Sequence, residues 1–376
     1  MPTKLKKLAL RGWRSIVDTG EPGIEIGDLN VLLGANGAGK SNLLAFFALL
    51  NASMEGRLNT FVGQELGGAS AQLAGGPRRT PVVVAKISFE GDSGSDEYGF
   101  TLAHAADDRF LFTDEHCGHR APDQERSILV PLGAGHFESA MRAASQQEGP
   151  DGATARFIRA TLLGWRFFHF HDTSARAAVK LGGAASDNLY LRADASNLAA
   201  FLLKLREESP GSYKLIRATV GLAAPFFEDF VLEPEGPGGG MIRLRWRQKG
   251  DDVAYGAHQL SDGTLRLMCL AALLLQPSLP SLIVIDEPEL GLHPYAIELL
   301  ATLLRQASEK AQVVISTQSV PLVDALASPD ELIVVDRQTG ASRFRRIDGE
   351  ALREWLEDYT LGQLWVKNLL GGGPRS

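Results

Sequence analysis

The residues best suited to chemistry in this sequence are two glycines, a lysine and a serine that follow a short apolar run. Residues 29–33 are typical of a buried strand, and the next eight residues read Gly-Ala-Asn-Gly-Ala-Gly-Lys-Ser. Glycines let backbone N–H groups approach phosphate oxygens, a lysine reaches the outer phosphates, and a serine at a helix start can bind Mg²⁺. The segment 34–41 therefore predicts a P-loop that binds a nucleoside triphosphate.

This loop defines the first set of candidate site residues. Lys40 is the expected cation for the outer phosphates, and Ser41 is the expected Mg²⁺ ligand. The apolar residues 43–47 predict the helix that follows such a loop. The expected nucleotide contacts are Gly34, Asn36, Gly37, Gly39, Lys40, Ser41 and Asn42.

A pair of acids follows a second apolar run. Residues 282–285 are β-branched and apolar, as in a buried parallel strand, and they lead directly into Asp286 and Glu287. Acids at the carboxyl end of such a strand face the nucleotide. Asp286 is expected to hold Mg²⁺ through water, and Glu287 to orient or deprotonate the attacking water. The wide gap between Lys40 and Asp286 disfavours small GTPases and nucleoside kinases, and it predicts an insertion within one nucleotide-binding domain.

The segment 259–264, Gln-Leu-Ser-Asp-Gly-Thr, opens an apolar helix just before the acid pair. Taken alone it is an ordinary helix start, but its place before the acids makes it resemble the signature motif of ABC-type ATPases. That resemblance implies that Ser261 and Gly263 bind the γ-phosphate of ATP held by a second copy of the chain. A homodimer that forms with ATP is therefore expected.

Further segments resemble the RecF/OLD/SMC-like branch of these ATPases. Residues 287–294, Glu-Pro-Glu-Leu-Gly-Leu-His-Pro, are similar to that branch's extension of the acid motif. Residues 8–16 resemble its first strand, and 197–202 resemble its arm region. The nearest match is to standalone ATPases with an AbiEii-toxin-like AAA domain, including the segment 355–365. The resemblance implies an α/β P-loop NTPase, an ABC-type ATPase head with a mixed α/β insertion arm, with ATP and Mg²⁺ as cofactors.

One position departs from that pattern. The predicted strand 313–317 ends at Gln318, where many members carry histidine. The Gln318 amide can donate a hydrogen bond to the γ-phosphate, but it cannot accept and return a proton. Gln318 is thus expected in the catalytic site, with slow turnover. A Q-loop residue is not assigned, because Gln64 and Gln72 lie in a Gly/Ala-rich stretch that is typical of a loop.

The motifs divide the chain into a discontinuous lobe and an insertion. Residues 1–104 and 255–376 are predicted to form the nucleotide-binding lobe, and 105–254 a mixed helical and β insertion that serves as an arm or lid. No heptads persist, which argues against a true SMC or zinc-hook protein. The expected strands lie near 29–34, 281–286, 312–317, 331–336, 226–233 and 241–248, and the expected helices of the insertion near 153–163, 195–207 and 212–223.

Composition is that of a cytoplasmic protein without a membrane segment. The chain has 376 residues, 44% of them hydrophobic, and a formal net charge of −7. Its longest apolar tract, 267–275, is about half of the roughly 20 residues that a membrane span needs. Two cysteines imply no disulfide framework. Net negative charge argues against indiscriminate coating of nucleic acid, although Arg243, Arg245 and Arg247 give one predicted strand a cationic face.

Two histidine groups are weaker candidates for metal binding. Residues 116–119, His-Cys-Gly-His, are placed in a polar loop without a second ligand pair at zinc-finger spacing. His169 and His171 are placed on one face of a strand. A structural role is the favoured interpretation of both.

Three classes of function remain. The favoured class is an ATP-hydrolysing dimer that controls a partner effector, such as a nuclease or toxin, or a DNA transaction in phage defence or repair. The second class is a clamp or scaffold for which ATP binding is the signal and turnover is slight, an interpretation that Gln318 supports. The third class, a transporter ATPase subunit, is disfavoured by the pattern of residues 287–294.

Overall fold

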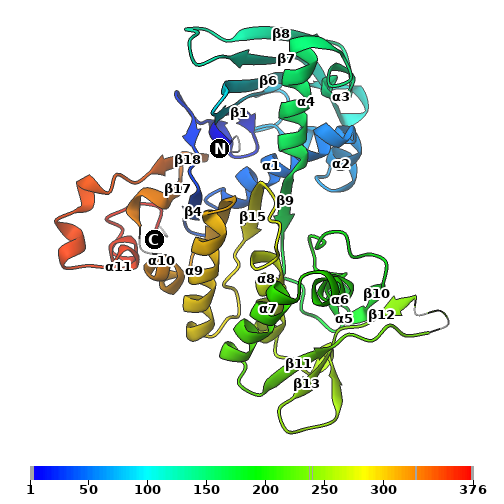
Figure 1. Cartoon of the computed structure of the whole chain (residues 1–376). Coiled ribbons are helices and arrows are strands. Elements are labelled where there is room, and N and C mark those ends of the chain that lie inside the picture. Colours follow the sequence, from blue (N-terminus) through cyan, green and yellow to red (C-terminus); the bar gives the residue numbers. More distant parts are fainter. Residues whose placement is uncertain (1–3, 237, 239, 327, 374–376) are drawn as a thin grey trace. The chain divides into compact units, whose positions relative to one another are not determined.

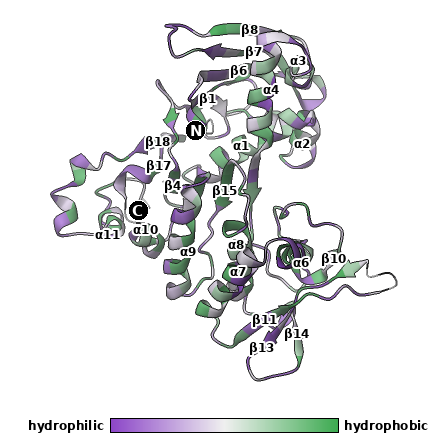
Figure 2. Cartoon of the chain, in the orientation of Figure 1, coloured by the Kyte–Doolittle hydropathy of each residue, from purple (hydrophilic) through white to green (hydrophobic). Residues whose placement is uncertain are grey.

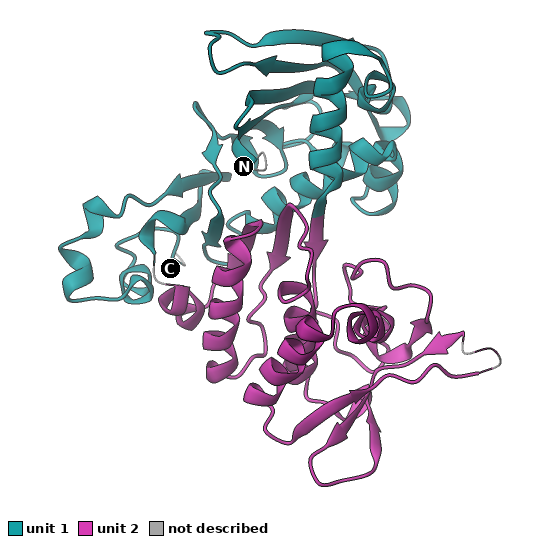
Figure 3. Cartoon of the chain, in the orientation of Figure 1, with its two compact units in different colours: residues 1–165, 328–376 teal, residues 166–327 magenta. Residues whose placement is uncertain are grey.

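The computed structural model describes residues 4–236, 238, 240–326 and 328–373 (Figure 1). The chain divides into two compact units (Figure 3). The first unit contains residues 1–165 and 328–376, and the second contains 166–327. The boundaries between these units differ from the predicted ones, which put residues 1–104 and 255–376 in the lobe and 105–254 in the insertion. The lobe and insertion therefore stay a prediction.

An antiparallel sheet of seven strands forms much of the first unit, in the order β2-β1-β5-β6-β7-β8, with β3 beside β1. Buried and outward residues alternate along β5, so that Val83, Ala85, Ile87 and Phe89 face the core. The strands are β1 (Lys4–Trp13), β2 (Ile16–Asp18), β3 (Ile24–Glu25), β5 (Val82–Gly91), β6 (Gly94–Ala105), β7 (Arg109–Arg120) and β8 (Ile128–Gly133).

Helices of the same unit close its core. Phe46 and Phe47 of α1 are fully buried, and their rings meet those of Trp13, Phe100 and Trp165. These aromatic side chains supply much of the apolar area that stabilises the unit. The helices are α1 (Lys40–Glu55), α2 (Leu58–Gln64), α3 (Met141–Ala144), α4 (Gly149–Leu163) and α11 (Leu361–Val366).

Three further strands of the first unit carry the P-loop. Strand β4 (Leu29–Leu33) is buried along its whole length and pairs in parallel with β17 (Leu332–Gln338). Strand β18 (Ala341–Arg346) returns antiparallel to β17. A parallel strand that is covered on both faces favours apolar residues, which explains Leu29 and residues 31–33. Asn30 is buried as well, and its side chain is paired with the Gly27 backbone at 2.8 and 2.9 Å.

The second unit contains the other predicted motifs. Strands β15 (Leu282–Asp286) and β16 (Gln312–Thr317) pair in parallel, and β15 is hydrophobic up to its last residue, Asp286 (Figure 2). The helices are α5 (Ala178–Leu181), α6 (Leu198–Glu208), α7 (Pro210–Ala223), α8 (Asp262–Leu274), α9 (Pro294–Ser308) and α10 (Val320–Leu326). The remaining strands are β9 (Trp165–Phe168), whose first residue still belongs to the first unit, β10 (Gly183–Ala184), β11 (Phe227–Val231), β12 (Met241–Ile242), β13 (Arg245–Gln248) and β14 (Ala254–Gly256).

These elements confirm most of the predicted strands and helices, with local corrections. The strand expected near 241–248 is broken into β12 and β13, although the arginines alternate with buried neighbours as predicted. Gln64 ends helix α2 and does not lie in a loop. The first strand ends at Trp13, because Arg14 has a positive φ of 48°. In the hairpin loop 236–240, Pro237 and Gly239 lie outside the described residues.

Both histidine groups were placed in the wrong element. Residues 116–119 belong to strand β7, where Gly118 leaves room for the Leu129 side chain of β8. His169 and His171 follow the end of β9 and are not on a strand. Among the described residues, no group of three or more His, Cys, Asp or Glu side chains could hold a metal ion.

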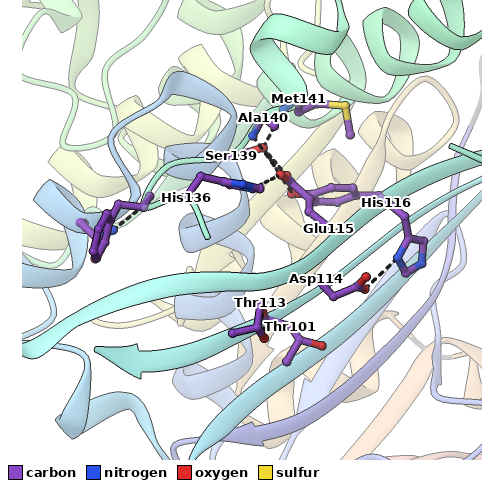
Figure 4. A network of polar contacts seen from close by, with 12 residues as sticks. Thr101, Thr113, Asp114, Glu115, His116, His136, Ser139, Ala140 and Met141 are labelled. Atoms are coloured by element: carbon purple, nitrogen blue, oxygen red, sulfur yellow. Dashed lines mark hydrogen bonds and ion pairs between the residues drawn. The ribbon is translucent and has the colours of Figure 1, made fainter. Parts of the chain in front are cut away.

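Next to these histidines, strand β7 carries a buried carboxylate, Glu115, which is held by several hydrogen bonds (Figure 4). Glu115 is 1% exposed and accepts hydrogen bonds from the Tyr98 hydroxyl at 2.6 Å and the Ala140 amide at 2.9 Å. The Tyr98 and Ser139 hydroxyls donate to Oε1, whereas Oε2 accepts from the Ala140 amide and lies 2.8 Å from His136 Nε2. Burial raises the pKa of Tyr98 well above its usual value, and the charge of Glu115 raises it further. The cluster fixes the chain after β8 against the sheet.

Over the described part of the chain, no helix is long and apolar enough to cross a membrane.

Candidate nucleotide-binding site

In the first unit, the P-loop lies between the end of β4 and the start of α1. Gly37 and Gly39 have φ of +77° and +113°, conformations that a side chain disfavours. A Cβ on Gly34 would lie 2.3 Å from the carbonyl oxygen of Val335 on β17. The three glycines are thus required for different reasons: two by backbone conformation, and Gly34 by the close approach of a neighbouring strand.

Lys40 folds back over the loop. It is 5% exposed, and its ammonium donates hydrogen bonds to the carbonyl oxygens of Gly34 at 2.6 Å and Ala35 at 3.2 Å. Asn36 and Ser41, the other polar candidates on the loop, are exposed. A cation held inside a ring of backbone groups at a helix N-terminus is the arrangement that attracts phosphate.

Two serines hold the loop from outside. The Ser342 hydroxyl of β18 donates to the Ala38 carbonyl at 2.6 Å and lies 2.6 Å from the Ser15 hydroxyl. The predicted nucleotide contact Asn42 donates its side-chain amide to Ser15 at 2.6 Å. The turn after β1, the P-loop and the β17–β18 hairpin are therefore joined by one hydrogen-bonded chain.

Two more contacts join the P-loop to the last described residues and to the hairpin. The Ala35 amide donates to the Gly372 carbonyl at 3.0 Å. Arg337 donates to the Gly37 carbonyl at 3.5 Å and to the Gly340 carbonyl at 3.2 Å. The P-loop thus depends on residues about 300 positions downstream in the same unit.

A cavity of about 530 Å³ lies beside α1 in this unit. Its walls include Asn42 and three arginines, Arg14, Arg79 and Arg337, and none of the described residues that line it is acidic. Arg14 is held by the Gln72 side chain at 2.7 Å, and burial lowers the pKa of its guanidinium. The cavity offers planar cationic donors to a neutral or anionic ligand.

In the second unit, the end of β16 holds three acids. Ser316 donates to Asp286, Thr317 donates to Glu289, and the Gln318 side-chain amide donates to Glu287 at 3.2 Å. Glu287 itself has a positive φ of 42°, and its backbone N–H donates to the Ser316 carbonyl at 3.0 Å. Glu287 and Gln318, both predicted to be catalytic, are brought together here.

The signature segment begins helix α8. Ser261 is exposed and caps the helix, because its hydroxyl accepts from the Thr264 backbone amide at 3.2 Å. A Cβ on Gly263 would lie 2.4 Å from the Gly291 carbonyl, so only glycine lets the acid-bearing turn approach the helix. Within one chain, both residues therefore have structural roles, and their expected contact with a second copy stays a prediction.

Arg266 on α8 reaches the segment that follows β9. It is 4% exposed and donates to the carbonyls of Phe170 at 2.8 Å and His171 at 3.2 Å. His171 Nε2 in turn lies 2.9 Å from the Asp286 carbonyl. His171 thus braces the strand end that carries Asp286.

A family comparison decides the identity of this chain. The family described as "AAA domain, putative AbiEii toxin, Type IV TA system" matches residues 29–325. The chain belongs to this family. No curated protein is similar enough to this AAA-domain protein to count as a match.

Solved structures show the same fold for this AAA-domain protein. An Smc head bound to the C-winged helix domain of ScpA has a TM-score of 0.56 at 15% identity, with 93% of this chain and 99% of the other covered. An Smc head with an extended coiled coil, bound to the C-terminal domain of ScpA from Pyrococcus furiosus, has a TM-score of 0.52 at 16% identity, with 95% and 99% covered. The predicted α/β P-loop fold of an ABC-type ATPase head is therefore confirmed.

Sequence reasoning missed several residues of the site. Ser15, Arg337 and Ser342 support the P-loop, and Glu289 is tied to Thr317 beside Gln318. The only signal for Glu289 was its place in the Glu-Pro-Glu pattern. The other three carry no local pattern, because their partners lie far away in the sequence.

Proposed function

We propose that this chain binds Mg-ATP and hydrolyses it, and that two copies associate when ATP is bound. The observation that carries the proposal is the P-loop itself, in which Gly37 and Gly39 have positive φ and Lys40 lies on the loop carbonyls. Membership of an AAA-domain family agrees with it. The expected phosphate contacts are those predicted from the sequence, and Ser41 is the expected Mg²⁺ ligand. The contacts on the loop are Gly34, Asn36, Gly37, Gly39, Lys40, Ser41 and Asn42.

The cavity beside α1 is the proposed place for the nucleoside. It borders the first turn of the P-loop helix at Asn42, and a base that entered it would meet guanidinium groups of Arg79 or Arg337. Guanidinium planes stack on bases and donate to ring nitrogens and ribose oxygens. Phosphates on the loop and a base in this cavity would use groups of one unit only.

The acids of the second unit are the proposed hydrolytic groups. Asp286 would hold Mg²⁺ through water, and the metal would supply charge neutralisation on the phosphates. Glu287 would take the proton of the attacking water. The Gln318 amide, at 3.2 Å from Glu287, fixes one carboxylate oxygen and leaves the other for that water. Because an amide does not take up a proton, we infer slow turnover.

Association of two copies would complete each site. Ser261 lies exposed at the N-terminus of α8, where its hydroxyl and the helix dipole favour a phosphate. We propose that it acts with Gly263 on ATP held by the other copy. The similar Smc heads are bound to ScpA domains, which supports a partner protein for this chain as well. We propose that the partner is a nuclease, a toxin or DNA, and that the chain acts in the cytoplasm in phage defence or repair.

The second candidate function is a nucleotide-gated clamp with little turnover. It is favoured by the same Gln318–Glu287 contact, in which no histidine is available. A single-turnover assay separates the two functions. A clamp should lose most of its bound ATP by dissociation before hydrolysis, whereas an ATPase should convert most of it to phosphate. A transporter subunit remains the least supported of the three.

Two variants test binding and hydrolysis separately. Lys40→Ala should abolish ATP binding, measured by calorimetry, because it removes the cation of the loop. Glu287→Gln should bind Mg-ATP normally but release phosphate slowly, because it keeps the shape of the side chain and deletes the base. The exposed residues Lys249 and Glu298 give matched controls, Lys249→Ala and Glu298→Gln. Normal ATPase activity in Lys40→Ala would overturn the site.

Light scattering tests association. Glu287→Gln with Mg-ATP should elute as a dimer, and Ser261→Arg should bind ATP yet remain a monomer with reduced hydrolysis. A mixture of Ser261→Arg and Lys40→Ala should regain at most one working site per dimer, formed by the intact Lys40 of one copy and the intact Ser261 of the other. A trapped variant that stays monomeric with ATP bound would show that the site is completed within one chain.

A further inference from the structure

Glu289 is a buried acid that the proposed hydrolysis does not use. Its side chain is 7% exposed. One carboxyl oxygen accepts a hydrogen bond from the Thr317 hydroxyl, and the other, Oε2, is buried with no hydrogen-bond partner among the described residues. A buried polar atom without a partner is rare in native proteins and calls for an explanation.

The backbone around Glu289 is a tight turn that starts at Glu287. The Leu290 amide donates to the Glu287 carbonyl at 3.2 Å, and the Leu292 amide donates to the Glu289 carbonyl at 3.0 Å. Glu287 enters this turn at a positive φ of 42°, which costs energy for a residue with a side chain. The orientation of Glu287 is therefore set by what holds the turn.

Thr317 connects this turn to the end of β16. It is fully buried, donates its hydroxyl hydrogen to Glu289, and accepts from the Ser319 amide at 2.9 Å. Gln318 lies between Thr317 and Ser319, and its side-chain amide meets Glu287 at 3.2 Å. Glu289 and Glu287 are thus held by two consecutive residues, Thr317 at the end of β16 and Gln318 just after it.

We propose that Glu289 is a positioning residue for hydrolysis: by anchoring Thr317, it holds the Gln318 amide against the Glu287 carboxylate. This inference rests on the proposed function. Glu289 acts through Thr317 and does not touch the reacting atoms. A side chain with only a packing role would be better served by an apolar group, because the carboxyl is buried with one oxygen unpaired. Burial raises the pKa of Glu289, and the charge of Glu287 raises it further, which is the cost of keeping a second acid at this place.

Four variants test the anchor by steady-state kinetics. Glu289→Gln keeps an oxygen that accepts from Thr317, whereas Glu289→Leu removes it and Thr317→Val removes the donor from the other side. We expect kcat to fall about tenfold or more in Glu289→Leu and Thr317→Val with KM within about threefold, because a misplaced Glu287 weakens the transition state and leaves ATP binding to the P-loop. Glu289→Gln should keep nearly normal kcat, as should the exposed control Glu298→Leu.

Hydrogen exchange of the Ser319 amide tests the same anchor without nucleotide. Its exchange should speed up in Glu289→Leu, which no longer holds the Thr317 hydroxyl, and in Thr317→Val, which deletes the oxygen that accepts from Ser319. It should stay as in the wild type in Glu289→Gln. If the wild type hydrolyses no ATP, the hydrolysis proposal fails, while the exchange data still decide whether Glu289 anchors Thr317. Unchanged exchange in all variants, or a normal kcat in Glu289→Leu, would overturn the positioning role.

Discussion

Replacement of Gly39 by alanine should destabilise the P-loop unit in a way that its neighbour Gly37 does not. Both glycines have positive φ, but their surroundings differ. An added Cβ at Gly37 meets nothing within 4 Å. At Gly39 it would lie 2.0 Å from the Ser342 Oγ and 2.9 Å from the Ser15 Oγ. The pair therefore separates the cost of backbone conformation from the cost of a steric clash.

The magnitudes follow from these two terms. A left-handed conformation costs a non-glycine residue roughly 1–2 kcal/mol, which is the whole penalty expected for Gly37→Ala. An overpacked buried site adds about 1–3 kcal/mol, so Gly39→Ala should cost about 2–5 kcal/mol. The double variant Gly39→Ala/Ser342→Gly lacks the clashing side chain. It should therefore regain about 1–3 kcal/mol of the free energy of unfolding that the clash removes, a coupling between the two positions.

Urea denaturation of the wild type, Gly37→Ala, Gly39→Ala, Ser342→Gly and the double variant, followed by circular dichroism, measures the free energies of unfolding. ATP binding should weaken in the same order, because a displaced Gly39 amide no longer points at phosphate. If Gly37→Ala and Gly39→Ala destabilise the chain equally, or if Ser342→Gly gives no recovery in the double variant, the contact between β18 and the P-loop does not restrain the loop as described.

Three other predictions concern the first unit and α8. Burial raises the pKa of Cys117 to about 11 and of Cys269 to about 12, so both thiols should react slowly with Ellman's reagent at pH 8 until urea is added; fast labelling of the folded protein would show that one is accessible. Glu138 accepts from the first two backbone amides of α2, at 2.6 and 2.9 Å, so Glu138→Ala should lower the free energy of unfolding by about 1–2 kcal/mol, and no loss in calorimetry would contradict the cap. The pKa of Tyr98 is raised above 10.0, so its contribution to stability is complete below that pH and is lost as pH rises further; the urea midpoint should fall less between pH 9 and 11 in Tyr98→Phe, and parallel curves would argue against it.

The sequence was sufficient to predict the local structure of the candidate site. The P-loop is predicted from one segment because its glycines, Lys40 and Ser41 lie within a few residues of one another. Strands β15 and β16 were predicted for a similar reason, since burial on both faces favours the apolar runs 282–285 and 313–315 at their centres. The sequence placed Gln318 and Glu287 after the carboxyl ends of two parallel strands, which predicts that they are near each other. It did not predict the hydrogen bond between their side chains.

The rest depended on contacts between distant residues. Nothing near Ser342 indicates that its hydroxyl will fill the space left by Gly39, because that contact is set by the pairing of β17 with β4. The loop predicted at 116–119 was wrong because histidine and glycine are weak strand formers, and cross-strand packing of Gly118 against Leu129 overrode that preference. Burial of Glu289 was equally invisible, since charged residues are seldom buried.

The residues that support the P-loop are translated long after the P-loop itself. The glycines of the P-loop are translated early, but Ala38 and the Ser342 that holds it are 304 positions apart. At about 5–20 residues per second, that distance takes about 15–60 s to translate. Gly372, whose carbonyl receives the Ala35 amide, comes later still. During that interval a nascent chain has the P-loop sequence without the hydrogen bonds that Ser342 and Gly372 make to it.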